Sequence, residues 1–209
     1  MKKLALIIIL IQIFSNLFGQ QKAITDTGDE VILFEDGTWV YQSEDLFKKN
    51  EIPVNEKKYK KEKNSNFLLK SNKLNIGFWL NPKEWAFKKA VENPVAEYEL
   101  HLKKGDLYAL VITEKIEIPL ETLKGIALEN GKSVAPDLKI VKEEYRNVND
   151  TKVLLLQMDG TTQGIKVTYY GYYYSNYQGT VQFITYTSQN LFKELKEECE
   201  RFLNSFVVI

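Results

Sequence analysis

The feature that most constrains the fold is a series of strand-length apolar segments separated by tight turns. The segments form three pairs, each around a turn rich in Gly, Asn or Asp: residues 97–102 and 107–114, 138–145 and 153–158, and 165–174 and 180–187. Strands joined by turns this short run antiparallel, because a parallel connection needs a crossover of a dozen or more residues. The sequence therefore predicts an antiparallel sheet of about six strands.

Two segments with helical periodicity accompany these strands. Pro119 opens the first, because proline suits the start of a helix, and Ser188 is a good N-cap for the second. Apolar residues fall on one stripe of each segment: Leu120, Leu123, Ile126 and Ala127 in the first, and Leu191, Phe192, Leu195, Cys199, Phe202, Leu203 and Phe206 in the second. We therefore predict an α+β fold in which amphipathic helices cover the antiparallel sheet.

The N-terminus has the pattern of an export signal. Met1-Lys2-Lys3 precedes the apolar run Leu4–Phe14, which is too short to span a bilayer as a helix. We predict a signal peptide over residues 1–20 that is cleaved near Gly19 or Gln20, with an uncleaved anchor as the alternative. No later run is long enough to cross a membrane. The expected location is periplasmic or secreted, without stable membrane insertion after cleavage.

The residues between the signal peptide and the main domain divide into two parts. Residues 21–42 predict a small β-hairpin module, since Asp36-Gly37 is a strong turn signal between two strand-like runs. Residues 43–66 predict a charged linker, because the stretch 57–63 is rich in lysine and has little apolar periodicity. A basic patch for nucleic acid or acidic lipid is the alternative reading. The α+β domain is expected over residues 67–209.

Charge and composition exclude several classes of function. Lys+Arg and Asp+Glu are both 28, so the chain lacks the basic excess of a nucleic-acid-binding protein. With one Cys and one His, the usual Cys/His zinc cage is impossible. We interpret Cys199 as a buried small hydrophobe, with a nucleophile as the alternative. We interpret His101 as a polar residue on a sheet face, with a general base or a metal ligand as the alternatives. We expect no metal site, no cofactor and no enzymatic activity.

The run of tyrosines in the segment 165–174 gives the candidate site. Strand alternation places Tyr169 and Tyr173 on one face, predicted to be core under a helix, and Tyr170 and Tyr172 on the other. We predict that Tyr170, Tyr172 and Tyr186 form an outward aromatic platform for binding, since tyrosine offers a large rigid surface with a polar tip. The alternative is that these aromatics only stabilise the sheet through cross-strand contacts.

Two segments of the domain resemble a known fold. Asn81-Pro82-Lys83-Glu84-Trp85 is similar to the proline-then-tryptophan entry of the Mog1/PsbP-like fold, and Tyr170-Gly171-Tyr172 with Gly179–Gln182 and a final helix resembles its ending. The resemblance covers about residues 74–206. Proteins of this superfamily include nuclear-transport regulators, photosystem extrinsic subunits and bacterial envelope proteins. Most bind another macromolecule, so the resemblance implies a binding scaffold. The hairpin with Gly37-Thr38-Trp39 resembles a short module of exported bacterial proteins.

These observations favour an exported, non-catalytic binding or assembly module that contacts an envelope or extracellular protein, or a glycan, through the aromatic face. Two alternatives stay open. A hydrolase of envelope polymers would use two of the carboxylates Asp137, Glu143, Glu144 and Asp159. A carrier of a small apolar ligand would need a pocket of some hundreds of Å³ between the sheet and the helices.

Overall fold

The computed structural model describes residues 21–24, 30–33, 39–41, 52–91 and 95–209. The chain separates into two compact units, Met1–Glu51 and Ile52–Ile209. The predicted signal peptide and the predicted Asp36-Gly37 turn lie outside the described residues.

The first unit contains a three-stranded antiparallel sheet. It consists of β1 (Gln21–Ile24), β2 (Glu30–Leu33) and β3 (Trp39–Tyr41) in that order. The backbone pairing of β2 with β3 is the hairpin that the sequence predicts, and β1 adds a third strand to it.

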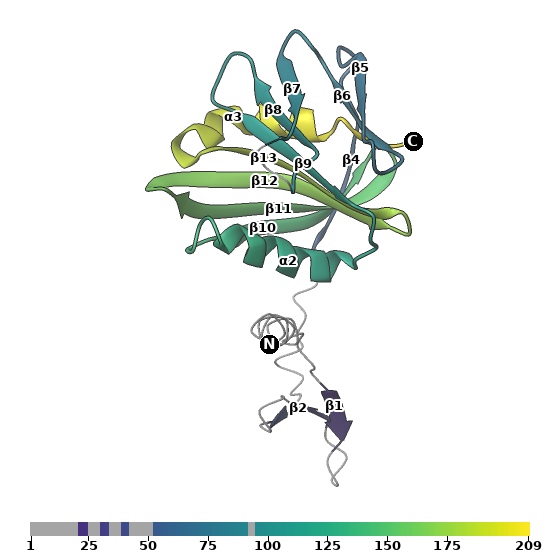
Figure 1. Ribbon diagram of the computed structural model, residues 1–209, viewed down its shortest axis with the longest axis vertical. Coiled ribbons are helices and arrows are strands. Elements are labelled where there is room, and N and C mark those ends of the chain that lie inside the picture. Colours follow the sequence, from purple (N-terminus) through teal and green to yellow (C-terminus); the bar gives the residue numbers. More distant parts are fainter. Residues whose placement is uncertain (1–20, 25–29, 34–38, 42–51, 92–94) are drawn as a thin grey trace, which may run out of the picture. The chain divides into compact units, whose positions relative to one another are not determined.

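The second unit is built on a mixed sheet of eight strands, shown in Figure 1. In spatial order these strands are β4 (Val54–Tyr59), β10 (Lys139–Val148), β11 (Thr151–Thr162), β12 (Ile165–Asn176), β13 (Gly179–Ser188), β9 (Tyr108–Glu114), β8 (Tyr98–Leu102) and β7 (Trp85–Lys89). All neighbours pair antiparallel except β4, which runs parallel to β10.

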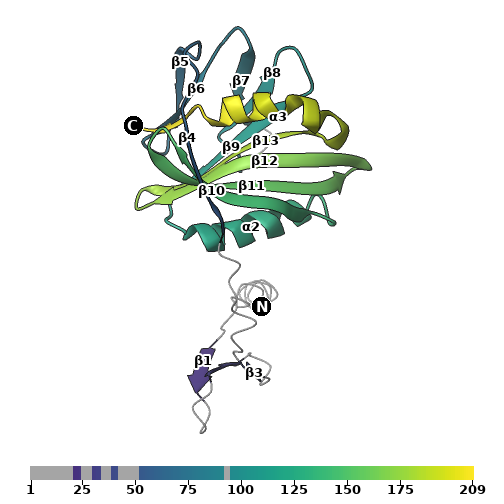
Figure 2. The same ribbon diagram turned by 180° about the vertical axis from the view of Figure 1, so that it is seen from behind.

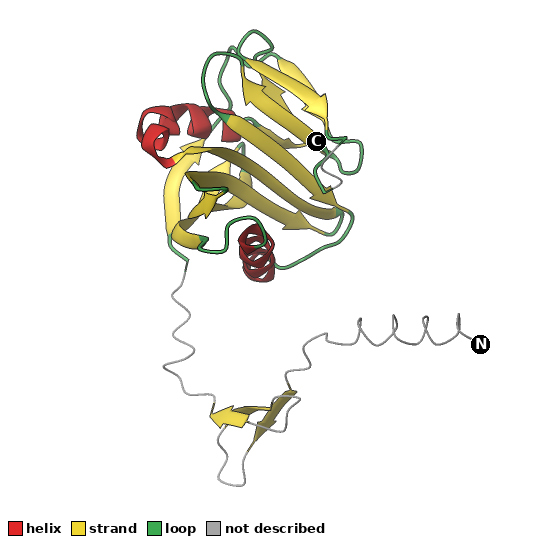
Figure 3. Cartoon of the chain, turned by 60° about the vertical axis from the view of Figure 1, so that its left-hand side comes forward, coloured by secondary structure: helices red, strands yellow, loops and turns green. Residues whose placement is uncertain are grey.

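Two helices and a second sheet cover the large sheet. Helix α2 (Leu120–Lys132) lies on one side of β10–β13 and α3 (Gln189–Leu203) on the other, as Figures 1 and 2 show from opposite directions and Figure 3 shows in a turned view. The small sheet consists of β14 (Phe206–Val208), β6 (Ile76–Leu80) and β5 (Phe67–Lys70), in that order. Within the described ranges, no helix is both long and apolar enough to cross a membrane.

Each face of the large sheet has its own hydrophobic core. On the α2 face, helix residues such as Leu123 and Ala127 pack with Leu154, Leu156 and Tyr173 of the sheet. The other face, which we call the α3 face, carries the larger core. Phe183 there lies 4.6 Å from Phe78 of β6 and 5.1 Å from Phe202 of α3, measured between ring centroids. The central strands β11 and β12 are therefore buried on both faces.

Tight turns join the long strands as the sequence predicts. Asn149 and Asp150 connect β10 to β11 with φ values of 48° and 65°. Both residues tolerate this left-handed conformation, which two-residue hairpin turns require. The three predicted strand pairs are confirmed as β8–β9, β10–β11 and β12–β13.

The strand count and the linker differ from the prediction. The large sheet has eight strands instead of about six, and it is mixed instead of purely antiparallel. Residues 54–59, assigned from sequence to the linker, form β4, so the α+β domain begins before residue 67. The charged side chains of β4 explain why the sequence does not predict it as a strand. Only Tyr59 of β4 is buried, and Glu56, Lys57 and Lys58 are exposed. Charged residues are common on edge strands, where they discourage pairing with other chains.

Candidate ligand-binding site

The predicted aromatic platform does not form. Tyr170 and Tyr172 were expected to face outward, but their exposed fractions are 0% and 1% because α3 and the small sheet cover them. Tyr186 is only partly buried, and it lies on the opposite face of the sheet. The three residues therefore do not share a surface.

The pairing of β12 with β13 explains this error. Alternation within β12 separates Tyr170 and Tyr172 from Tyr169 and Tyr173 as predicted, and α2 covers the second pair. The prediction that Tyr186 shares a face with Tyr170 and Tyr172 is wrong, because it shifts the alternation of β13 by one residue. Phe183 lies directly opposite Tyr172, so it belongs to the α3 face, whereas Tyr186 lies opposite Tyr169 on the α2 face.

Buried polar contacts hold the hydroxyls of Tyr170 and Tyr172. Nη2 and Nη1 of Arg146 donate to these hydroxyls at 3.1 and 3.2 Å. Tyr170 donates to Oε1 of Glu200 at 2.7 Å, and Nε of Arg146 donates to Oε1 of Glu144 at 2.6 Å. Sequence analysis missed Arg146. The sequence signal for Arg146 is its position two residues after Glu144, because residues two apart in a strand lie on the same face and these two carry opposite charges.

The electrostatics of this network fit a structural role. Burial raises the pKa of Tyr170 and of Tyr172, so both phenols stay neutral. Burial alone would lower the pKa of Arg146, but the neighbouring Tyr172, Tyr170 and Glu144 raise it. Burial likewise opposes ionisation of Glu200, yet the hydrogen bond from Tyr170 and the charge of Arg146 lower its pKa. Arg146 and Glu200 therefore stay charged and both phenols stay neutral, so the network offers no group ready for proton transfer.

A separate apolar pocket of about 430 Å³ lies between α2 and the sheet. Its floor includes Leu110 and Ile112 of β9 and Ile184 of β13. Ala127 and Gly131 line it from α2. Helix α2 packs mainly against β11 and β12, so its edge leaves this hollow over β9 and β13.

Tyr173 forms part of the wall of this pocket and has an unusual hydroxyl. The side chain is fully buried, and within the described part of the chain the hydroxyl has no hydrogen-bond partner. Burial raises the pKa of this phenol, so the hydroxyl is a neutral donor at physiological pH. The hydroxyls of Tyr170 and Tyr172 on the same strand are both bonded. The structure thus leaves one buried donor unused, on the residue paired directly opposite the buried Gln182.

A row of aromatic side chains begins at the pocket and crosses the same face of the sheet. Tyr169, which also lines the pocket, has its ring centroid 6.0 Å from that of Tyr186. The Tyr186 ring stacks on Tyr108 at 5.5 Å, and Tyr108 is 42% exposed. His101, an exposed residue, is the next strand neighbour of Tyr108. Of this row, sequence analysis found only Tyr186, because its partners depend on strand register.

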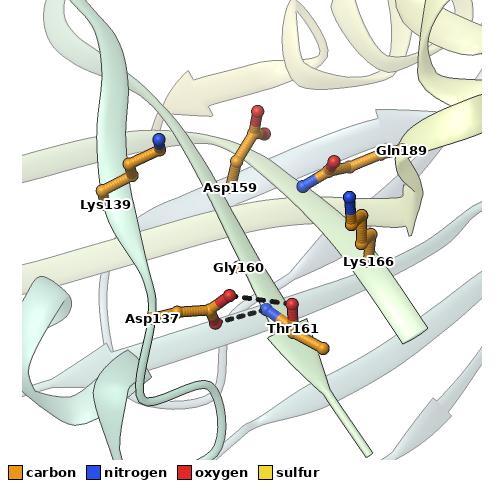
Figure 4. Close-up of a pocket in the computed structure, with 7 residues that line it drawn as sticks. All are labelled: Asp137, Lys139, Asp159, Gly160, Thr161, Lys166 and Gln189. Carbon is orange, nitrogen blue, oxygen red and sulfur yellow. Dashed lines mark hydrogen bonds between the residues drawn. The ribbon is translucent and has the colours of Figure 1, made fainter. Parts of the chain in front are cut away.

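A second hollow, of about 300 Å³, is polar and is shown in Figure 4. Asp159 lies between Lys139 on one side and Gln189 and Lys166 on the other. Asp137 accepts hydrogen bonds from the backbone and side chain of Thr161 at 2.6 and 2.8 Å. These bonds lower the pKa of Asp137, whereas a general acid needs a raised one.

The other candidate groups for catalysis are also engaged or inert. Glu143 is paired with Lys124 at 2.8 Å, and Glu144 with Arg146. Cys199 is buried, as predicted, and burial raises the pKa of its thiol to about 11. Among the described residues, no group of three or more His, Cys, Asp or Glu side chains is placed to hold a metal ion.

Comparisons with known proteins bear on the fold. No protein-family model matches the sequence, and no curated protein matches it. The solution structure of cyanobacterial PsbP (CyanoP) from Synechocystis sp. PCC 6803 matches with a TM-score of 0.51 and 13% identity, covering 71% of this chain and 95% of that one. This similarity confirms the predicted Mog1/PsbP-like fold.

Two further structures match with lower scores. PA94 of Pseudomonas aeruginosa, a protein of unknown function, has a TM-score of 0.42 and 12% identity over 59% of this chain and 81% of that one. LpqN, involved in cell envelope biogenesis of Mycobacterium tuberculosis, has a TM-score of 0.36 and 10% identity over 95% of both chains.

Proposed function

We propose that this chain is an exported, non-catalytic binding protein that holds a small, mainly apolar ligand in the pocket between α2 and the sheet. The observation that carries the proposal is an apolar pocket of about 430 Å³ whose lining includes a few polar side chains, among them Gln182 and Asn130. Pockets for small molecules typically measure about 300–1,000 Å³ and combine apolar walls with a few polar groups. Export is inferred from the basic start and apolar run of the sequence.

The state of the titratable groups supports binding without catalysis. Asp137 has a lowered pKa, Glu144 is held by Arg146, and the Cys199 thiol has a raised pKa. A nucleophile needs an adjacent base or a lowered pKa, and a carboxylic general acid needs a raised one. None of these three groups meets its requirement.

Binding of an apolar fluorescent probe tests this function. N-phenyl-1-naphthylamine, titrated into the mature chain, should bind at one site with increased, blue-shifted emission. Ile184→Trp should weaken binding by on the order of tenfold or more, because the larger ring occupies the pocket floor. Ile126→Trp is the matched control, since Ile126 lies on α2 but is exposed and outside the pocket lining.

The folding of both variants is checked by urea unfolding before the titration. Probe binding that is unchanged in Ile184→Trp would place the probe elsewhere and contradict the proposal. The absence of saturable binding to the unmodified chain would contradict it as well.

A second candidate function is contact with an envelope protein through the row Tyr169, Tyr186 and Tyr108. The observation that favours it is the stacking of Tyr186 on the partly exposed Tyr108. Tyrosine is enriched in protein interfaces because it combines a rigid apolar ring with a polar tip. Crosslinking in the native envelope should capture a partner that Tyr108→Ser loses. Tyr177→Ser is the control, because Tyr177 is an exposed tyrosine outside the row.

A further inference from the structure

Gln182 is a buried polar residue in the lining of the pocket between α2 and the sheet. It lies on β13, and its exposed fraction is 6%. Glutamine is mostly found at the surface, because its amide oxygen accepts hydrogen bonds and its nitrogen donates two. Native proteins nearly always satisfy such groups when they are buried. Within the described structure, however, the side chain of Gln182 makes no hydrogen bond.

The residues next to Gln182 leave its amide unpaired. Ile112 of β9 and Tyr173 of β12 lie directly opposite it on the two neighbouring strands. Thr180 and Ile184 are its same-face neighbours along β13. No hydrogen bond joins Gln182 to the hydroxyl of Tyr173 or of Thr180 in the described part of the chain. One hydroxyl can pair with only one end of an amide, so the other end would need a further partner in any case.

The amide of Gln182 is in contact with the pocket, whereas the hydroxyl of Tyr173 is not. Among the described residues, the unbonded polar atoms that are cut off from solvent are Oδ1 of Asn147 and the hydroxyl oxygens of Tyr173 and Ser205. The amide atoms of Gln182 are unbonded but not cut off, and the space beside this side chain is the pocket. A partner for the amide therefore comes from the contents of the pocket.

The charge of the lining restricts these contents further. Glu114 is the one charged residue among the described residues that line the pocket. A carboxylate ligand would enter an apolar cavity beside Glu114, with no lysine, arginine or histidine in the described lining to pair with, which is unfavourable. A neutral group that both donates and accepts meets no such penalty.

We infer that the pocket selects a neutral, mainly apolar ligand that carries a hydrogen-bond donor and an acceptor side by side, as a carboxamide or lactam does, and that the amide of Gln182 pairs with both. This inference rests on the proposed function and adds the class of ligand. The hydrocarbon part of the ligand lies against Leu110, Ile112 and Ile184. Gln182 is a specificity-determining residue here, because a ligand without one of the two groups leaves one end of its amide unpaired.

Two probes of one shape separate this pairing from the apolar contacts. 2-Naphthamide and 2-acetylnaphthalene both carry a carbonyl group, and they differ in an NH₂ group against a methyl group. Calorimetric titration gives the ratio of their affinities for the mature chain and for Gln182→Met, which keeps the length of the side chain and removes its amide. The hydration of the free probes cancels when the two ratios are compared. Gln182→Met should shift the ratio against 2-naphthamide by roughly three- to tenfold, the effect of one neutral hydrogen bond.

Asn130→Leu is the matched control for this variant. It also removes a side-chain amide from the pocket lining, but Asn130 is exposed, so water satisfies its amide and the ratio should not change. Urea unfolding establishes that both variants fold before the titration. Nuclear magnetic resonance adds a direct reading in the unmodified chain: the Nε2 protons of Gln182 should show nuclear Overhauser effects to the protons of bound 2-naphthamide.

Each outcome bears on one of the two proposals. If neither probe binds the unmodified chain, the proposed function fails and this inference fails with it. If both probes bind and Gln182→Met leaves the ratio unchanged, ligand binding stands and the pairing with Gln182 is overturned. An equal shift in Asn130→Leu, or the absence of the Overhauser effects, would overturn it as well. Tighter binding of 2-naphthoate than of 2-naphthamide would overturn the selection of a neutral ligand.

Discussion

Arg146 and Tyr170 are joined under α3, where Nη2 of the guanidinium donates to the phenol oxygen at 3.1 Å. The same nitrogen lies 3.2 Å from Oε1 of Glu200, the carboxylate oxygen that accepts the hydrogen bond of Tyr170. The guanidinium also lies over the ring of Tyr59, 4.6 Å from its centroid. One cation thus connects the edge strand β4, the central strand β12 and the helix α3.

Replacing this cation should strongly destabilise the fold. Arg146→Met leaves Glu144 and Glu200 without their buried partner, and removing one member of a buried ion pair costs about 3–5 kcal/mol. Arg201→Met is the matched control. The side chain of Arg201 is half exposed, so this change should cost about 1 kcal/mol or less. Urea unfolding of both variants measures the difference, and equal costs would contradict the structural role of Arg146.

Two neighbouring tyrosines should respond in opposite ways to loss of the hydroxyl. Tyr172→Phe leaves Oδ1 of Asn204 and Nη1 of Arg146 without a partner, and we expect a loss of about 1–3 kcal/mol. Tyr173→Phe removes a hydroxyl that has no partner among the described residues, so the unliganded chain should keep or gain stability. Urea unfolding without added ligand tests both. A clear loss of stability in Tyr173→Phe would mean that its hydroxyl is bonded in solution.

The sequence predicts those parts of the fold that depend on neighbouring residues. The hairpin around Asn149 and Asp150 follows from turn chemistry, and the separation of Tyr172 from Tyr173 follows from alternation within one strand. The helix after Pro119 follows from its apolar stripe. These signals extend over a few residues, so they can be read without knowing how the chain packs.

The parts that the sequence did not predict depend on residues far apart in the chain. The parallel pairing of Val54 with Tyr145 joins segments with no turn between them. The phase of β13 depends on the register of the turn, where Asn176 lies opposite Gly179, and a shift of one residue exchanges the two faces. The ligand pocket depends on where α2 rests on the sheet, which no local pattern determines.

The buried carboxylate of Glu97 should make stability depend on pH. It accepts hydrogen bonds from the hydroxyls of Ser71 and Thr113 at 2.7 and 2.5 Å and from the backbone of Asn72 at 2.5 Å. Burial alone would raise the pKa of Glu97, but these hydrogen bonds outweigh it and hold the pKa below the ordinary value of 4.5. The carboxylate is therefore favoured in the folded state.

The sign of the pH effect follows from this lowered pKa. Below 4.5 the unfolded chain binds more protons than the folded chain, so the stability supplied by Glu97 is complete above 4.5 and is lost as the pH falls through the folded-state pKa. The difference in unfolding free energy between the unmodified chain and Glu97→Gln should be largest near neutral pH and shrink below pH 4.5. Glu56→Gln, at an exposed position, should show a small difference throughout. A difference for Glu97→Gln that is constant with pH would contradict this prediction.

The start of the stable domain can be located by truncation. Nδ2 of Asn55 donates to Oε1 of Glu144 at 3.1 Å, and the backbone of Pro53 accepts a hydrogen bond from that of Tyr145 at 2.8 Å. Removing residues before 52 leaves these contacts intact. Removing residues before 67 deletes β4 and uncovers Arg146, because Tyr59 covers its guanidinium.

We therefore expect the fragments 52–209 and 67–209 to differ in stability although both keep the strands β5 to β14. Fragment 52–209 should unfold in one cooperative transition with the free energy of the mature chain, since residues 1–51 form a separate compact unit. Fragment 67–209 should lose roughly 3 kcal/mol or more, the scale of losing one buried aromatic side chain. Urea unfolding followed by circular dichroism measures both values. Equal stability of the two fragments would show that β4 contributes nothing to the core and would restore the predicted domain boundary at residue 67.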